Sequence, residues 1–200
     1  MRKQSKDYVL KLVRLGLLAA MSLLLVYLIR FPIFPAASFL EYDMADVPIL
    51  IGTFLYGPAA GLVLTLVVSV LQWLLVSPAS GWIGAAMHFF ATGAFVLVAG
   101  NLYQRHRTLK GAVVSLVLGA VTMIAMMIPL NLIFTGHFMG TPMDVVWSMM
   151  FPVIVPFNAI KAFGNGALTF LLYKAVGRAL RLGELPEKKR EENAPAQNMN

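Results

Sequence analysis

The chain has 200 residues, of which 59% are hydrophobic and only 12% are charged, and it contains no cysteine. A soluble domain of this size cannot bury so much apolar surface, whereas a bilayer can solvate it, and the lack of cysteine excludes disulfides, thiolate catalysis and cysteine-ligated metals. The net charge of +7 comes from basic residues beside apolar runs, which indicates membrane topology and anionic lipid rather than nucleic acid. We therefore predict an all-α, polytopic membrane protein.

The chain opens with a basic segment, residues 1–14, followed by an apolar run over residues 15–29. This order predicts a cytoplasmic N-terminus and a first membrane helix. It is also the pattern of a secretory signal peptide, whose cleavage region would fall within residues 34–38. We favour a retained helix, because the segment that follows is apolar and continuous with the rest of the pattern.

Residues 30–46 interrupt the helical pattern, because Pro32 and Pro35 break helix. Two interpretations of this aromatic-rich segment stay open: it packs over the mouth of the helix bundle, or it forms an aromatic belt at the membrane interface. In both, we expect its acids on the outer side. The segment supplies most of the acids between the two termini, and these are Glu41, Asp43 and Asp46.

Residues 47–76 form one long apolar stretch that the pair Gly57-Pro58 divides. A single helix here would place the basic cluster of residues 105–110 outside the cell, whereas a turn at Gly57-Pro58 keeps it in the cytoplasm, in agreement with the positive-inside rule. We therefore predict two helices. The first, over residues 47–56, is too short to span and is expected to lie partly buried among its neighbours.

Three further apolar stretches predict the remaining helices, over residues 82–103, 111–134 and 152–180. The second of these is expected to bend near Pro129. The total is a six-helix transmembrane bundle over residues 15–181, with both termini in the cytoplasm and an outer loop over residues 135–147. Residues 182–200 are polar and lack apolar periodicity, which predicts a disordered cytoplasmic tail.

Lys161 lies inside an apolar run of membrane-spanning length, where a charge is costly and marks a candidate functional site. Asn158 precedes it by one helical turn and shares its face, while Asn131 lies near the outer end of the preceding helix. Simpler explanations exist: the asparagines can satisfy carbonyls freed by nearby prolines, and Lys161 can snorkel outward. We favour a ligand or a buried counter-charge for Lys161, and predict that the three residues form the polar part of an outward-open pocket.

The remaining polar positions and the motifs searched for indicate no catalytic or nucleotide-binding site in this chain. A lone intramembrane histidine such as His88 often only bonds a neighbouring helix. The sequence has no P-loop, H-E-x-x-H or G-x-S-x-G motif. We therefore predict no catalytic residue, metal site or cofactor, and a binding module that depends on another protein for energy.

Three short runs carry a resemblance to a known family: D-M-A-D-V-P-I-L-I-G from Asp43, G-P-A-A-G from Gly57, and P-F-N-A-I-K from Pro156. They are similar to the substrate-binding S components of energy-coupling factor (ECF) vitamin transporters, and specifically to the riboflavin branch. The resemblance covers essentially everything but the two tails. Other branches share the six-helix plan but have different polar residues.

The resemblance implies that the protein binds riboflavin, with FMN as a second candidate ligand, in an outward-facing pocket covered by the first loop. It also implies partners, namely a transmembrane coupling (T) component and two ATP-binding cassette ATPases, which deliver the vitamin after the S component topples in the membrane. The flavin contacts of the family fall on Asn131, Asn158 and Lys161. Its docking face on the first helix falls on small residues, which are here Gly16, Ala19 and Ala20.

Flavin chemistry suits these residue types. The isoalloxazine ring is flat and apolar, with one edge that offers two carbonyl oxygens and an N–H; an asparagine amide can donate to and accept from that edge, whereas Lys161 can only donate. The alternatives are an S component for another vitamin or nucleobase-like compound, a lipid-acting membrane enzyme, or a structural subunit. By position, the aromatic residues that enclose the ring are predicted to be Phe34, Phe39, Tyr42, Trp73 and Phe89.

Overall fold

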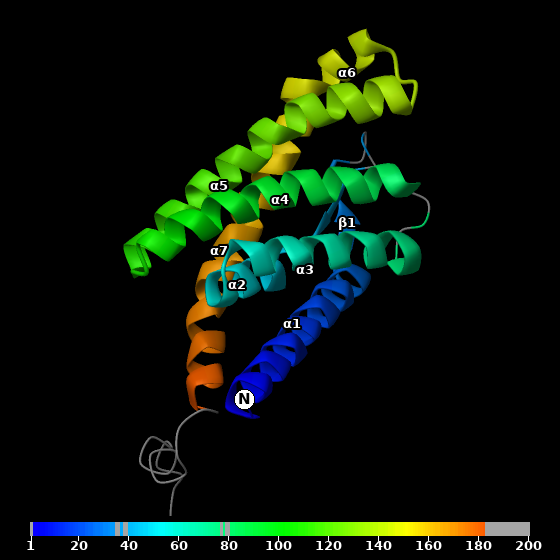
Figure 1. Ribbon diagram of the computed structural model, residues 1–200. Helices are drawn as coiled ribbons and strands as arrows, with labels where there is room; N and C mark the ends of the chain where they lie inside the picture. Colours follow the sequence, from blue (N-terminus) through cyan, green and yellow to red (C-terminus); the bar gives the residue numbers. More distant parts are fainter. Residues whose placement is uncertain (1, 35–36, 38–39, 77, 79–80, 183–200) are drawn as a thin grey trace, which may run out of the picture.

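The computed structural model describes residues 2–34, 37, 40–76, 78 and 81–182 of the chain. Helices make up most of the fold (Figure 1), and the η segments are π-helical turns that continue the neighbouring α-helices. The elements in chain order are α1 Arg2–Leu28, β1 Arg30–Pro32, β2 Glu41–Asp43, α2 Asp46–Tyr56, α3 Pro58–Leu71, η2 Gln72–Val76, α4 Gly81–Arg105, α5 Leu109–Leu130, η4 Asn131–Phe138, α6 Met143–Met149, η5 Met150–Ile154 and α7 Val155–Leu182.

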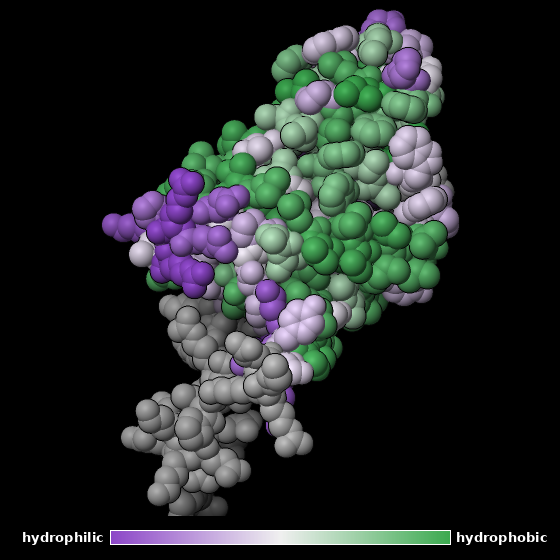
Figure 2. Space-filling model, in the orientation of Figure 1, coloured by the Kyte–Doolittle hydropathy of each residue, from purple (hydrophilic) through white to green (hydrophobic). Residues whose placement is uncertain are grey.

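The predicted helical, polytopic architecture is confirmed. Large apolar side chains lie exposed on the long helices, as lipid contact requires, and Figure 2 shows hydrophobic residues over much of one face. Hydrophilic residues gather in the same view at the connection between α4 and α5. Five segments of the described chain are long and apolar enough to cross a membrane, and these are Ser5–Leu28, Pro58–Val76, Gly81–Arg105, Leu109–Phe138 and Met143–Tyr173.

The predicted division at Gly57-Pro58 is also confirmed. Gly57 has a φ of 92°, a conformation that glycine adopts without strain. Pro58 lies in the first turn of α3, where its missing N–H breaks no hydrogen bond. The helix before this turn, α2, has 11 residues that are mostly buried, and it packs against α1, α3, α4 and α7. Burial inside the bundle explains how a helix too short to span can be so apolar.

The structure refines three details of this helical fold. The first helix begins at Arg2 rather than near residue 15, so the basic segment continues it. Residues 30–46 contain a pair of three-residue antiparallel strands, in which Arg30 lies opposite Asp43. The expected outer loop contains the last turn of η4 and the short helix α6. Local hydropathy predicted none of the three, because the basic start of α1 is polar and exposed and the other two features lie outside the long apolar runs.

The helices run back and forth between two ends of the bundle. The start of α1, the α2–α3 turn, the α4–α5 connection and the end of α7 lie toward the lower and left side of Figure 1, whereas α6 and the end of α1 lie toward the upper and right side. In the described chain, the short helix α2 joins the five longer segments as a sixth helix of the bundle. The predicted disordered tail, from residue 183 onward, lies outside the described residues.

Candidate functional site

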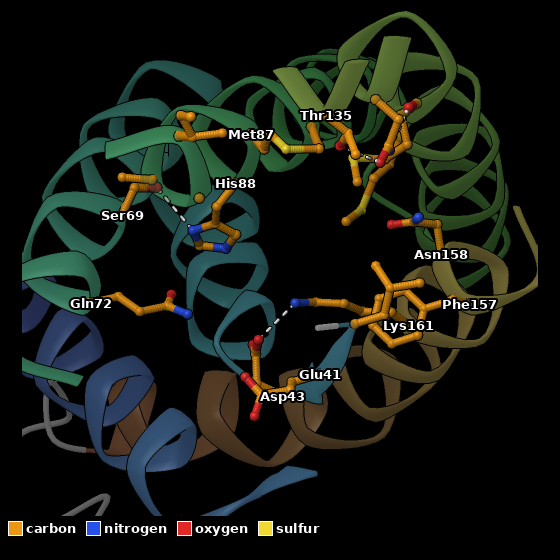
Figure 3. A pocket seen from close by; sticks show the side chains of 18 of the residues that line it. Glu41, Asp43, Ser69, Gln72, Met87, His88, Thr135, Phe157, Asn158 and Lys161 are labelled. Carbon is orange, nitrogen blue, oxygen red and sulfur yellow. Dashed lines mark hydrogen bonds and ion pairs between the residues drawn. The ribbon is translucent and has the colours of Figure 1, made fainter. Parts of the chain in front are cut away.

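A cavity of ≈ 650 Å³ opens among α3, α4, α5, α7 and β2 (Figure 3). Its volume is typical of small-molecule sites, which span roughly 300–1,000 Å³. Polar side chains point into it from several elements, including Ser69, His88 and Asn158 (Figure 3). The walls are otherwise mostly apolar and include five methionines, which are Met87, Met123, Met127, Met139 and Met149.

The structure brings the three polar residues predicted for the pocket together on the wall of this cavity. Asn131 is 2% exposed, and Asn158 and Lys161, one turn apart on α7, are 1% and 8% exposed. The side-chain amide of Asn131 donates to the carbonyl of Met127, and that of Asn158 donates to the carbonyl of Ile154 (both 2.8 Å). Each asparagine thus bonds the carbonyl four residues before its own position, and both also line the cavity.

Lys161 forms a buried ion pair with Asp43 of β2, with 2.7 Å between Nζ and Oδ2 (Figure 3). The side chains are only 10% and 6% exposed. The opposite charge offsets part of the cost of burying the ammonium, so the prediction of a buried counter-charge is confirmed and snorkelling is excluded. Because an ammonium has three N–H donors, Lys161 can hold Asp43 and donate to a second group in the cavity.

A chain of buried hydrogen bonds lies behind this ion pair. Asn165 of α7 donates to the backbone carbonyl of Asp43 (3.1 Å) and to the carboxylate of Asp46 (3.0 Å), and it accepts from the hydroxyl of Tyr42 (3.0 Å). Burial, and then the charge of Asp43, raise the pKa of Tyr42, so its hydroxyl stays protonated and can donate. One asparagine thus joins β2, α2 and α7.

Asp46, at the first position of α2, extends these contacts to α3 and α4. Its carboxylate is fully buried, accepts from the hydroxyl of Thr92 (2.8 Å) and lies 3.1 Å from Nε2 of His88. The other ring nitrogen of His88 lies 2.9 Å from the hydroxyl of Ser69. His88 therefore bonds neighbouring helices, as expected for a lone intramembrane histidine. These contacts fix the start of α2 against three other helices.

The sequence interpretation missed Asp43 and Asp46 as part of the site. It placed both acids in an outer loop, whereas the structure folds them into the bundle with 4% and 0% exposure. The available signal was the run D-M-A-D directly before an apolar helix, in a chain whose buried lysine requires a counter-charge. The third acid of the segment, Glu41, is partly exposed.

A second ion pair lies on the cavity wall, between Arg30 of β1 and Glu41 of β2. The distance from Nε of Arg30 to Oε2 of Glu41 is 2.6 Å, and Nη1 of Arg30 lies 3.4 Å from the carbonyl of Val76. The two side chains are 28% and 33% exposed, so this pair is more accessible than the one at Lys161. Arg30 of β1 and Glu41 and Asp43 of β2 line the cavity, which favours a covering role for the two strands.

Of the four predicted aromatic residues that the structure describes, Trp73 lines the cavity. Phe34 packs against a second core cluster, Tyr42 lies behind Asp43, and the ring of Phe89 contacts that of Phe90. Phe39 lies outside the described residues. Position along the sequence predicts how deep a residue lies in the membrane but not the direction in which its side chain points.

The predicted docking residues on α1 have helical spacing but differ in exposure. Gly16 and Ala20 are exposed, whereas Ala19 packs into the core with Leu18. Positions 16 and 20 lie about one turn apart on the helix, and the turn between them points position 19 toward the bundle. The docking face stays a prediction, and within it Gly16 and Ala20 are the exposed pair of small residues.

Known proteins resemble this chain along most of its length. The family described as ECF transporter, substrate-specific component, matches residues 10–173. The riboflavin transporter RibU of Lactococcus lactis subsp. cremoris (strain NZ9000) is 31% identical over 126 residues, which are 62% of this chain and 61% of that protein, less than two thirds of its length. The riboflavin transporter RibU of Staphylococcus aureus (strain TCH60) is 28% identical over 191 residues, 90% of this chain and 97% of that one.

The fold is similar to that of a solved protein as well. A chain described as the S component of a bacterial ECF transporter superposes with a TM-score of 0.70 at 28% sequence identity. The superposition covers 85% of the present chain and 96% of the solved one. The similarity therefore extends over most of the fold.

Proposed function

Because the chain belongs to the family of ECF transporter substrate-specific components, we propose that it binds riboflavin for import across the membrane. The chain is a multi-pass membrane transport protein and not an enzyme. The identity of the substrate, riboflavin, is a more specific assignment than the family. It is supported by the two relatives described above, which carry the name riboflavin transporter.

The observation that carries the proposal is the convergence of Asn131, Asn158 and Lys161 on one largely apolar cavity. The apolar walls suit a flat ring system, and methionine side chains adapt their shape to such a ring. The carboxamides suit the edge of the ring that carries both carbonyl oxygens and an N–H. Lys161, held in place by Asp43, would donate to a carbonyl oxygen or ring nitrogen.

We infer that partner subunits supply the energy for import. The sequence has no P-loop, and the family implies a transmembrane T component and two ATPases. The exposed pair Gly16 and Ala20 is our candidate for close contact with the T component, since small residues let helices approach in lipid. Both termini are assigned to the cytoplasm because the exposed Arg105, Arg107 and Lys110, at the connection between α4 and α5, lie at the same end of the bundle as the start of α1 and the end of α7.

The absorption spectrum of the detergent-purified protein tests the flavin assignment. We expect the near-ultraviolet and visible bands of a flavin, or quenching of riboflavin fluorescence when the vitamin is added to the protein. Lys161→Ala should weaken both, whereas Lys110→Ala, at an exposed position far from the cavity lining, should not. A colourless wild-type protein that leaves riboflavin fluorescence unchanged would refute riboflavin as the substrate while leaving the family intact.

A further inference from the structure

The lining of the cavity pairs each of its fixed cations with a carboxylate. Lys161 holds Asp43, and Arg30 holds Glu41. Among the described lining residues, these four are the only lysine, arginine, aspartate and glutamate side chains. The charges of these four lining side chains therefore cancel in pairs. Such a cavity suits an uncharged ligand.

The two pairs differ in what an incoming anion would meet. The Lys161 pair is buried, whereas Arg30 and Glu41 are 28% and 33% exposed. Glu41 presents a negative charge at this accessible part of the wall. The guanidinium beside it is already engaged through Nε and Nη2 by Glu41 and through Nη1 by the carbonyl of Val76. The carboxylate of Glu41 therefore repels an incoming anion. The N–H groups of Arg30 that could bind the anion are already bonded to Glu41 and Val76.

We propose that Glu41 makes the site selective for the uncharged flavin over its phosphate monoester, FMN. Glu41 does so by repelling the phosphate, which carries about −1.5 to −2 charges at neutral pH, and by occupying Arg30. A free guanidinium in this place would be a strong partner for phosphate, because its planar fork matches two phosphate oxygens. This inference rests on the proposed function, since it assumes that a flavin occupies the cavity.

The test compares two ligands on the full-length protein in detergent. The dissociation constants of riboflavin and FMN are measured by flavin fluorescence quenching for the wild type, Glu41→Gln and the double variant Arg30→Gln/Glu41→Gln. The wild type should prefer riboflavin, and Glu41→Gln should reduce that preference by roughly tenfold, which corresponds to about 1.4 kcal/mol. The double variant should lose this gain in FMN binding, because the cation that receives the phosphate is gone.

A ligand-side control separates charge from size. Riboflavin 5′-acetate extends the ribityl chain without adding charge, so the wild type should bind it more tightly than FMN. If the acetate binds as weakly as FMN, size and not charge excludes the phosphate, and the role of Glu41 is refuted. The role of Glu41 is also refuted if Glu41→Gln leaves the ratio of the dissociation constants of riboflavin and FMN unchanged.

The outcomes also separate this inference from the proposed function. A wild-type protein that binds riboflavin and FMN equally well overturns the selectivity by Glu41 alone. A wild-type protein that binds neither flavin overturns the proposed function and this inference with it. If FMN binding stays raised in the double variant, Arg30 is not the group that receives the phosphate.

Discussion

The cavity has two unlike sides. The polar side consists of Asp43, Asn158 and Lys161. Behind it, Asp46 and Asn165 connect β2, α2 and α7 through buried hydrogen bonds. The methionine side, made by α4 and α5, consists of Met87, Met123 and Met127. A polar group fixes the direction of a bonded partner, whereas methionine is unbranched and adapts to shape. The first side can therefore orient a ligand, and the second can accommodate its outline.

The two sides should also differ in their tolerance of substitution. Every buried polar group on the polar side depends on a specific partner, and removing one leaves another unsatisfied at a cost well above that of a lost contact. The methionine side depends on volume and apolarity, which several residues can supply. The following variants test this difference, from the largest expected effect to the smallest.

Asp46→Ala should be the most damaging change. It removes the acceptor shared by Thr92 and Asn165 and the partner of His88, all in the interior. We expect a loss of about 4–5 kcal/mol in the free energy of unfolding, which is a fall of roughly 10 °C in the thermal midpoint. The measurement is thermal unfolding in detergent. Asp144→Ala, at an exposed position on α6, is the matched control and should leave the midpoint within about 1 °C.

Lys161→Met should destabilise the protein somewhat less, by about 3 kcal/mol, because the carboxylate of Asp43 loses its cation but keeps the N–H of Ala45 as a donor. Riboflavin binding should weaken about 100-fold, as expected when one buried charged donor is removed. The double variant Asp43→Asn/Lys161→Met should regain most of the stability without regaining binding. Recovery of both would mean that Lys161 serves the fold and does not contact the ligand.

The sequence predicted those features that follow from local pattern. The turn at Gly57-Pro58 follows from charge and length, and Asn158 and Lys161 share a face because of helical spacing. The partner of Lys161 could not be predicted in this way, since Asp43 is separated from it by 118 residues and the contact depends on how the strands fold onto the bundle. The burial of Ala19 could not be predicted for a related reason: composition shows a small residue but not whether its side of the helix faces the bundle or the lipid.

Tyr42→Phe tests the hydrogen bond from Tyr42 to Asn165, and its effect on stability should be smaller than that of the variants above. The variant keeps the ring but removes the hydroxyl that donates to Asn165, so one buried acceptor loses its partner. We expect a cost of about 1–2 kcal/mol in the free energy of unfolding, measured as for Asp46. Tyr27→Phe changes the same group where the side chain is 74% exposed and should have no measurable effect. Equal midpoints for the two variants would show that the contact with Asn165 contributes nothing to stability.

Met127→Leu tests the methionine side and should have the smallest effect. Leucine has nearly the same volume, so the cost in the free energy of unfolding should stay below about 1.5 kcal/mol, and the backbone carbonyl that accepts from Asn131 is retained. Riboflavin affinity should fall by only a few-fold, because leucine fills the wall but adapts less to the ring. Met126→Leu, one position along α5 and 36% exposed, controls for the helix itself. A loss of binding at Met127 as large as that at Lys161 would mean that the methionine side also positions the ligand, and the contrast between the two sides would not hold.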